Sequence, residues 1–332
     1  MFLRFLCLVF LTTSIFANSQ SFEDFLNQVR KTATEQGVSK ATIDKAFFGL
    51  TPNLDILKSD SAQAEFNQNF WHYVNKRVSQ VRLNNGNDTL KQNASLLNKT
   101  SQKYGVPAYV LVAFLGLESN YGNYMGNENL VRSLATLAYD PRRSSFFTKE
   151  LIALLKLIDK NTIPLDAKGS WAGAMGAVQF MPTNVIAYGV DANNDGKVNL
   201  WNDKEDIYAS AANFLKKLGW EKGEKWGREA FIPKNFDYRL TGLETKRTVN
   251  EWAALGVLRG NGSRLPKSDF KASLIVPMGH RGPAFLVYRN FDTILGWNRS
   301  ILYALSVAYL SDRLNGNGKL TAKSIDEPLL SK

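Results

Sequence analysis

One apolar stretch constrains the fold of this chain more than any other feature: VPAYVLVAFLGL, residues 106–117. It is followed by Glu118, the only ionisable side chain between Val106 and Ser119 apart from the phenol of Tyr109. The stretch predicts an apolar helix that surrounds this carboxyl with apolar neighbours one and two turns back. Because desolvation disfavours the charged form, we expect the pKa of Glu118 to be raised, as a general acid near neutral pH requires.

A second interpretation of the same acid stays open at this point. Asn120 and Gly122 predict that the helix ends directly after Glu118. Most glutamates are solvated, so Glu118 could simply end the helix and mark the surface. Because of the apolar run, the catalytic and the surface interpretation of Glu118 are about equally well supported, and other parts of the sequence are needed to choose between them.

The first residues, MFLRFLCLVFLTTSIFA, are typical of a secretory signal peptide, which we place at residues 1–17. Arg4 precedes the apolar part, and Ala17 is the expected cleavage edge. A short N-terminal anchor is the alternative, but the segment is too short for a membrane span. The sequence therefore predicts an exported chain without a membrane span.

Scarce cysteine and histidine exclude several kinds of site. Cys7 is the only cysteine and lies inside the predicted signal peptide, so the mature chain would have no disulfide and no thiol chemistry. The only histidines are His72 and His280. A histidine-based metal site or a Ser-His-Asp triad is therefore close to excluded.

The charge of the chain indicates the kind of partner it binds. The formal net charge of +11 is spread along 332 residues without a block of Lys or Arg. A diffuse basic surface suits an anionic polymer, either nucleic acid or a cell-wall glycan. No nucleic-acid recognition motif is visible, so we expect no nucleic-acid partner.

Helical periodicity dominates the chain and predicts a mainly α-helical (α+β) protein. We expect an N-terminal helical region at residues 18–104 and a core at residues 105–227 and 288–325. Short β-type runs, KASLIVP and AFLVYR, predict a small β-containing insertion at residues 228–287. The glycines of GSWAGAMGAVQFMP predict backbone packed very close to other parts of the chain.

Five sequence blocks between residues 113 and 220 occur in the order of a known family: FLGLESNYG, SLATLAYDPRRSSFF, GSWAGAMGAVQFMPTN, DANNDGKVNLWN and SAANFLKKLGW. With RNFDTILGWNRSILYALSVAYL near the C-terminus, the chain resembles the lytic murein transglycosylase B family over most of its mature length. The resemblance implies that the core is lysozyme-like and that the protein is periplasmic. Many relatives are lipoproteins with a cysteine right after the signal; this chain has none there, so we expect a soluble form.

The resemblance also implies a reaction, in which Glu118 is the catalytic acid and base. It would protonate the glycosidic oxygen between N-acetylmuramic acid and N-acetylglucosamine. It would then take the proton of the muramoyl 6-hydroxyl, which attacks the anomeric carbon and leaves a 1,6-anhydro end. Ordinary glycosidases use two carboxyls. One suffices here because the nucleophile belongs to the sugar, and the nearest other acid before DPRR is Glu128.

Further positions match substrate-binding residues of the family: Ser170, Gln179, Phe180, Arg142, Arg143, Phe214, Trp297, Asn298 and Tyr303. Ser170 and Gln179 would hydrogen-bond the substrate or the catalytic carboxyl, and Phe180 would be a groove aromatic. The two arginines could equally be a solvated pair after a proline turn. Trp297 and Phe214 stand where relatives often have tyrosine, which keeps a stacking face and loses a hydroxyl.

The segment DANNDGKVN reads as the start of a calcium loop. Asp191, Asn193 and Asp195 supply oxygens at alternate positions, and Lys197 supplies a backbone carbonyl. Position 12 is Asn202 instead of Glu. The resemblance implies a later closing acid, which would be Glu205 or Asp206. The alternative is an Asx-rich turn without metal.

Peptidoglycan strands are the expected substrate, no cofactor is required, and cell-wall synthesis or remodelling complexes are the expected partners. A hydrolytic muramidase, in which water replaces the 6-hydroxyl, is the nearest rival function. A glycan-binding protein without turnover is the rival from another class, and retention of Glu118 argues against it.

Overall fold

The computed structural model describes residues 21–61 and 69–323. The predicted signal peptide at residues 1–17 therefore lies outside the described residues. Within them the chain is mainly helical, as predicted. The helices are α1 (Phe22–Glu35), α2 (Lys40–Phe47), α3 (Leu54–Ser61), α4 (Phe70–Arg77), α5 (Gln80–Gln92), α6 (Ala94–Tyr104), α7 (Ala108–Ser119), α8 (Leu130–Tyr139), α9 (Ser144–Asp159), α10 (Pro182–Tyr188), α11 (Lys204–Leu218), α12 (Val249–Ala254), α13 (Arg289–Trp297) and α14 (Ile301–Leu314).

Two small sheets accompany the helices. A two-stranded sheet pairs β1 (Glu128–Asn129) with β2 (Lys168–Gly169). A five-stranded antiparallel sheet has the order β4-β6-β7-β3-β5. Its strands are β3 (Gly227–Phe231), β4 (Lys246–Thr248), β5 (Leu258–Arg259), β6 (Lys271–Ile275) and β7 (Ala284–Val287). The two β-type runs of the sequence, KASLIVP and AFLVYR, form β6 and β7 as predicted.

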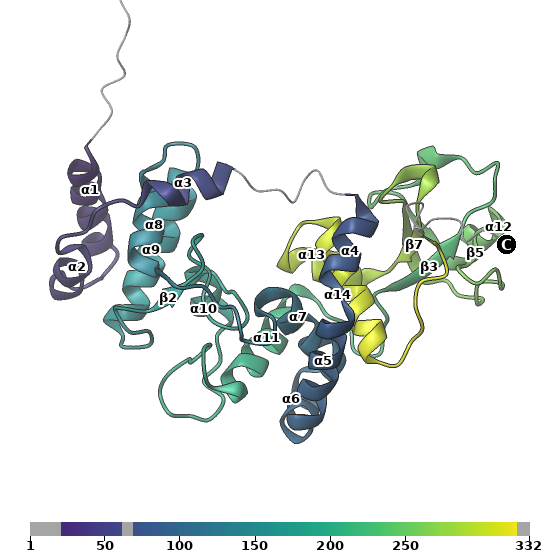
Figure 1. Ribbon diagram of the computed structural model, residues 1–332, viewed down its shortest axis with the longest axis horizontal. Coiled ribbons are helices and arrows are strands. Elements are labelled where there is room, and N and C mark those ends of the chain that lie inside the picture. Colours follow the sequence, from purple (N-terminus) through teal and green to yellow (C-terminus); the bar gives the residue numbers. More distant parts are fainter. Residues whose placement is uncertain (1–20, 62–68, 324–332) are drawn as a thin grey trace, which may run out of the picture.

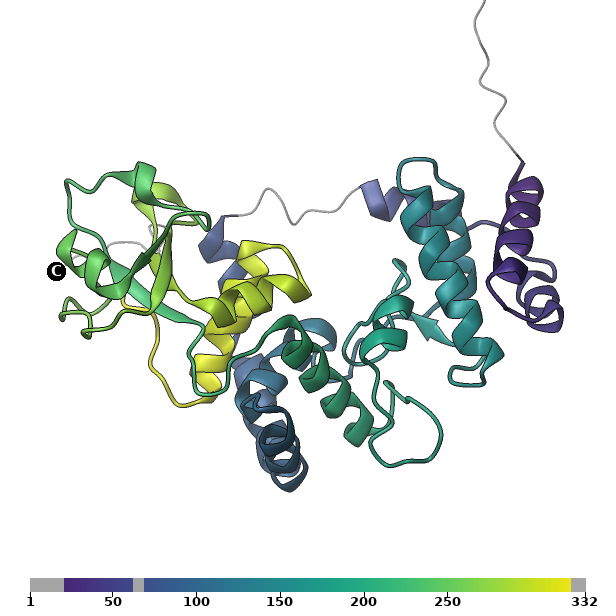
Figure 2. The ribbon, with the colours of Figure 1, turned by 180° about the vertical axis from the view of Figure 1, so that it is seen from behind.

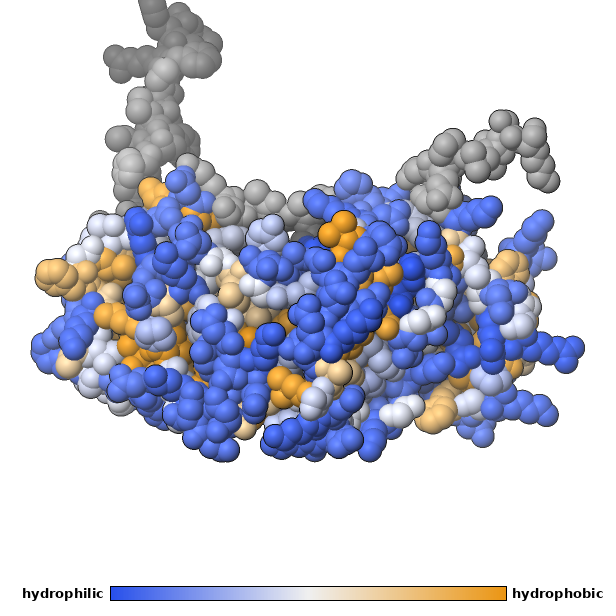
Figure 3. All heavy atoms as spheres, turned by 60° about the horizontal axis from the view of Figure 1, so that its bottom comes forward, coloured by the Kyte–Doolittle hydropathy of each residue, from blue (hydrophilic) through white to orange (hydrophobic). Residues whose placement is uncertain are grey.

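The elements form an elongated molecule. Helices α1, α2, α8 and α9 lie at one end, the five-stranded sheet lies at the other, and α7 and α14 lie between them (Figure 1). The view from behind in Figure 2 shows the same order. Polar side chains cover most of the face drawn in Figure 3, with apolar patches between them.

Strand β7 joins the sheet to the helical body. Ala284 and Leu286 belong to a small core that also contains Trp252 of α12, whereas Phe285 and Val287 belong to the main helical core. Successive side chains of a strand point to opposite faces. The sheet therefore has its own core on one face and packs against the helices with the other.

Helix α7 forms the centre of the helical body. Nine of its 12 residues are buried, and it packs against α5, α6, α11 and α14. The apolar stretch of the sequence is thus a core helix, as its length suggests, because a bilayer needs about 20 residues. No helix in the described ranges is long and apolar enough to cross a membrane.

Candidate active site

Glu118 lies in the last turn of α7 and is only partly buried, although nearly all its helical neighbours are fully buried. The helix ends at Asn120, as predicted. Asn120, Tyr121 and Gly122 all have positive φ angles, of 50°, 63° and 87°. Three successive left-handed residues turn the chain sharply, and for tyrosine this conformation is costly. The acid therefore sits at an abrupt turn that other contacts have to hold.

Ser119 and Tyr121 supply those contacts. The Ser119 hydroxyl donates to the carbonyl of Ala177 at 2.6 Å and accepts from the N–H of Gly122 at 2.9 Å. The Tyr121 hydroxyl donates to the carbonyl of Arg82 on α5 at 2.7 Å. Sequence analysis did not identify either residue, and the only signal for them was their place beside Glu118.

Gly116 makes room for this arrangement. A Cβ atom there would lie 2.7 Å from the Tyr121 hydroxyl oxygen and would therefore clash with the Tyr121 side chain. Only glycine lets the Tyr121 ring lie against α7 while its hydroxyl reaches α5. The glycine in GLESNYG thus has a packing role that sequence analysis did not predict.

Tyr303 connects α14 to the acid. Its hydroxyl donates a hydrogen bond to Glu118 Oε1, although the two residues are 185 positions apart. Tyr303 is 3% exposed. Burial, and then the negative charge of Glu118, raise the pKa of Tyr303 well above its ordinary value. The phenol therefore stays protonated and acts as a fixed donor to the carboxyl.

An aromatic cluster surrounds this pair. The ring of Trp297 lies 4.4 Å from Phe114, 5.0 Å from Phe214 and 5.4 Å from Phe180, between centroids. Phe180 and Phe214 are 1% and 5% exposed. Both rings lie inside the core in this structure and support the site from there, and their contact with a substrate stays a prediction. Trp297 is only partly buried and keeps some exposed surface.

The glycine-rich segment is held to the turn after α7 by Gln179. Its amide nitrogen donates to the carbonyls of Gly176 at 2.9 Å and Met125 at 3.2 Å. The predicted close packing of backbone is confirmed, since a Cβ atom on Gly176 would lie 2.3 Å from the carbonyl oxygen of Leu200. Ser170 closes a turn in the same segment, where its hydroxyl accepts from the N–H of Ala174 at 3.0 Å.

The remaining predicted binding residues lie in turns. Asn298 joins α13 to α14, and its side chain accepts from the N–H of Ser300 at 3.0 Å. Arg142 pairs with Asp140 at 2.5 Å, which lowers the pKa of that carboxyl. Arg143 is exposed and lies 4.7 Å above the ring of Phe147. The described contacts of both arginines are therefore local to the turn between α8 and α9.

The predicted calcium loop lies directly before α11. Asp191 accepts from the N–H groups of Asp195 and Gly196 at 3.1 and 2.8 Å, and Asp195 accepts from that of Lys197 at 2.9 Å. The oxygens of Asp191, Asn193 and Asp195 are of the type that calcium prefers. Within the described ranges, however, no three His, Cys, Asp or Glu side chains are grouped to hold a metal ion.

The acids after the loop differ from one another. Asp206 is fully buried and accepts from the N–H groups of Ala192 and Asn199 at 2.8 and 2.7 Å. Its burial raises the pKa of its carboxyl. Both oxygens of Asp206 accept hydrogen bonds from the backbone, as those of Asp191 also do, and Asp206 stays a predicted ligand. Glu205 is partly buried, and Asp203, which sequence analysis did not identify, accepts from the side chain of Asn193 at 2.6 Å.

The family described as the Transglycosylase SLT domain matches residues 21–312 of the chain. The chain belongs to this family. The family membership confirms the resemblance inferred from the five sequence blocks, and the structural neighbours below confirm the lysozyme-like fold class.

Individual members of this transglycosylase family also resemble the chain. The membrane-bound lytic murein transglycosylase B of Escherichia coli (strain K12) is 34% identical over 244 residues, which are 71% of this chain. The matching part spans 64% of that relative's length. SltB3 of Pseudomonas aeruginosa, in complex with NAG-NAM-pentapeptide, is 42% identical with a TM-score of 0.89, covering 93% of this chain and 83% of its own.

A calcium-bound structure also belongs to this group. The Escherichia coli lytic transglycosylase Slt35 in complex with calcium is 31% identical, with a TM-score of 0.75, covering 91% of this chain and 94% of its own. These neighbours share the overall fold of a transglycosylase family, and the roles of individual residues in this chain rest on its own geometry.

Proposed function

We propose that the protein is a lytic transglycosylase that cleaves the β-1,4 bond between N-acetylmuramic acid and N-acetylglucosamine in peptidoglycan. The observation that carries this proposal is the pair of Glu118 and Tyr303. A partly exposed carboxyl ends a buried helix, at a sharp turn, and takes a hydrogen bond from a buried phenol. Family membership supplies the substrate class.

In the proposed reaction, the protonated Glu118 gives its proton to the glycosidic oxygen as that bond breaks. The carboxylate then takes the proton of the muramoyl 6-hydroxyl, whose oxygen bonds to the anomeric carbon. The products are a 1,6-anhydromuramoyl end and a free 4-hydroxyl on the neighbouring sugar. The Tyr303 donor fixes the rotation of the carboxyl, so that the same group can act in both steps.

The substitution Glu118→Gln tests the assignment. It removes the transferable proton and keeps the shape, so we expect a loss of about 10²–10⁴ in turnover with glycan binding retained. Mass spectrometry of digested sacculi measures the products. Reducing ends without anhydro sugars from the unaltered protein would instead support the hydrolytic muramidase, and undiminished cleavage by the variant would remove Glu118 from the mechanism.

The remaining predicted residues enter the same proposal. Gln179, Ser170, Asn298 and Trp297 would border the bound glycan, and Arg142 and Arg143 would contact it farther from the acid. Support for the first four is their place in or beside the aromatic cluster and the turn after α7. We also propose the division of the chain given by the sequence, with the sheet at residues 228–287 as the insertion.

We further propose a weak calcium site at the loop before α11, held by Asp191, Asn193, Asp195 and the carbonyl of Lys197. Glu205 or Asp206 would close it. When bound, the ion would stabilise the loop and take no part in the chemistry. The periplasm is the proposed location and cell-wall synthesis or remodelling complexes are the proposed partners.

A further inference from the structure

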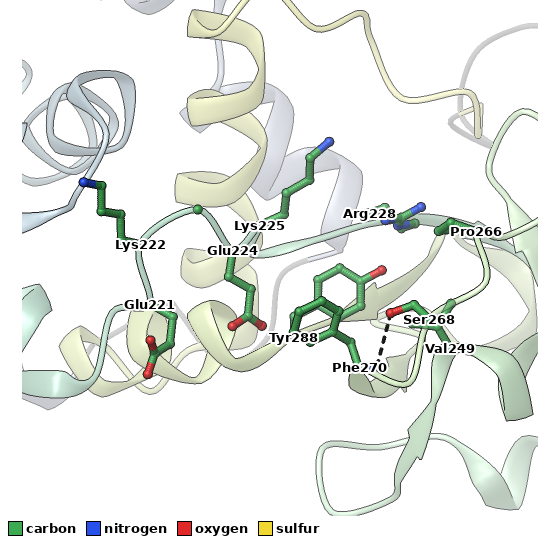
Figure 4. Close-up of a pocket in the computed structure, with 11 residues that line it drawn as sticks. Glu221, Lys222, Glu224, Lys225, Arg228, Val249, Pro266, Ser268, Phe270 and Tyr288 are labelled. Atoms are coloured by element: carbon green, nitrogen blue, oxygen red, sulfur yellow. Dashed lines mark hydrogen bonds between the residues drawn. The ribbon is translucent and has the colours of Figure 1, made fainter.

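A cavity of about 660 Å³ lies where the helical body meets the five-stranded sheet. Figure 4 shows the residues that line it. They come from the segment after α11, from the start of β3, from the first residue of α12, from the loop that precedes β6 and from the residue before α13. None of them belongs to the site around Glu118, so the cavity is a separate feature of the fold.

The lining carries charges of both signs. Its cations are Lys222, Lys225 and Arg228, and its acids are Glu221 and Glu224. Glu221 is paired with Arg289 at 2.9 Å, which leaves Glu224 as the acid next to the cations. A ligand with both an anionic and a cationic group would suit this lining better than one with either alone.

Arg228 and Tyr288 form the polar wall of the cavity. The guanidinium carbon lies 5.6 Å from the centre of the Tyr288 ring, and the hydroxyl of Tyr288 points toward Arg228 in Figure 4. Tyr288 is 7% exposed. Within the described part of the chain, the Tyr288 hydroxyl and Arg228 Nε are buried without a hydrogen-bond partner of normal geometry.

Arg228 and Tyr288 interact with each other, since a side-chain hydrogen bond from Arg228 is among the causes that lower the pKa of Tyr288. The guanidinium carries further N–H groups besides Nε, and a carboxylate can accept from a guanidinium through two parallel hydrogen bonds. Glu224 lies on the other side of the Tyr288 ring from Arg228 in Figure 4. Burial raises the pKa of Tyr288, the charge of Arg228 lowers it, and the charge of Glu224 raises it.

An exposed aromatic side chain borders the opening. Phe270 is 65% exposed, although most large apolar side chains of the sheet are buried. With Pro266 and Val249 it gives the cavity an apolar edge beside the charged wall. Such an edge suits the side chains of a short peptide.

We propose that this cavity binds a short peptide carrying a free carboxylate and a free amine, with the carboxylate on Arg228 and the amine beside Glu224. The stem peptide of peptidoglycan has this chemistry. The identification of the peptide as a stem peptide rests on the proposed function, whereas the binding site itself rests on the cavity.

The distance from the site of cleavage suits a peptide attached to the glycan. Tyr288 precedes α13 and Trp297 ends it, so the cavity and the aromatic cluster lie at opposite ends of this helix. Nine helical residues rise about 13 Å. An extended pentapeptide spans about 17 Å, which is enough to cover that distance.

Calorimetry with free stem pentapeptide tests the proposal without depending on catalysis. We expect the unaltered protein to bind the peptide, and Arg228→Gln to weaken binding at least about ten-fold, because a charged bidentate contact is lost. Arg228→Lys, which keeps the charge, should fall between the two. Phe270→Ala changes an exposed side chain, so it should weaken binding without affecting folding. The matched control is Arg281→Gln, an exposed arginine of the same region outside the lining, which should bind as the unaltered protein does.

Three results would overturn the proposal: no binding of the pentapeptide, equal binding of a peptide with amidated carboxylates, or equal binding by Arg228→Gln. The fate of the proposed function is read separately, from anhydro ends released from peptide-free glycan. Arg228→Gln should release them at an unchanged rate. Peptide binding without any cleavage would remove the proposed function and keep the site, and cleavage without peptide binding would do the reverse.

Discussion

Two polar turns in this protein have similar residue compositions but differ in the hydrogen bonds that hold them. The turn after α7, residues 118–122, and the loop before α11, residues 191–197, are both rich in Asn, Gly and acids. In the first, side chains bond to partners far away in the chain: Tyr303 reaches Glu118, and Tyr121 reaches Arg82. In the second, Asp191 and Asp195 bond to N–H groups two to five residues on.

The difference indicates what each turn can do. A turn held by α5, α14 and the glycine-rich segment keeps one carboxyl in one orientation, as a catalytic group requires. The second turn is held by its own side chains and by the adjacent helix α11, whose Asp206 accepts from the N–H of Ala192, so it keeps its shape when more distant parts change. We therefore expect substitutions in the first turn to affect both stability and activity, and substitutions in the second to affect stability alone.

The largest combined effect on stability and activity is expected from matched glycine substitutions. Gly116→Ala places a Cβ atom 2.7 Å from the Tyr121 hydroxyl, so the ring must move and its bond to Arg82 is lost. We expect a loss of about 2 kcal/mol in the free energy of unfolding, since overpacking typically costs 1–3 kcal/mol. Cleavage should fall at least about ten-fold because Glu118 is two residues away. Urea unfolding and a sacculus assay measure the two.

Gly196→Ala is the control in the second turn. Its φ of 87° disfavours alanine, but a Cβ atom there meets nothing within 4 Å. The cost should be about 1 kcal/mol from backbone conformation alone, with unchanged cleavage. Equal losses of activity in the two variants would show that the two turns do not differ as described.

The second largest effect is expected from Tyr303→Phe, which removes the donor to Glu118. Turnover should fall about 10- to 100-fold, because a hydrogen bond to a charged group is worth about 1.5–3 kcal/mol. Tyr309→Phe on the same helix removes a hydroxyl that accepts from Arg313 at 3.4 Å, and it should leave turnover unchanged. If the two variants cleave equally well, Tyr303 does not act on the acid.

Sequence reasoning succeeded for local features and for family patterns. The apolar helix, its end at Asn120, the two strands and the close packing of the glycine-rich segment all follow from periodicity and from residue types that permit unusual backbone angles. The burial of individual side chains could not be predicted in this way, because it depends on which face of an element is covered. Phe180 and Phe214 match positions of groove aromatics, yet α13 covers them with Trp297.

Contacts between segments that are distant in the sequence also could not be predicted. Nothing in YGNY indicates that Tyr121 bonds to α5, because Arg82 contributes a carbonyl that every residue carries. The burial of Asp206 likewise depends on how the loop folds over α11. Whether Glu205 or Asp206 is the closing ligand remains a prediction.

The smallest effect in this series is expected from calcium. With few carboxylates in the loop, we expect a Kd of about 1 mM, typical of weak sites. At about 10 mM calcium the free energy of unfolding should then rise by about 1.4 kcal/mol. Asp195→Asn should abolish that rise, whereas Asp237→Asn, which alters an acid outside the loop, should retain it. A chelator should leave cleavage unchanged, because the loop and Glu118 are held by separate sets of contacts. Loss of cleavage on chelation would mean that the loop before α11 also orders the turn after α7. The two turns would then not be held independently, contrary to the comparison made above.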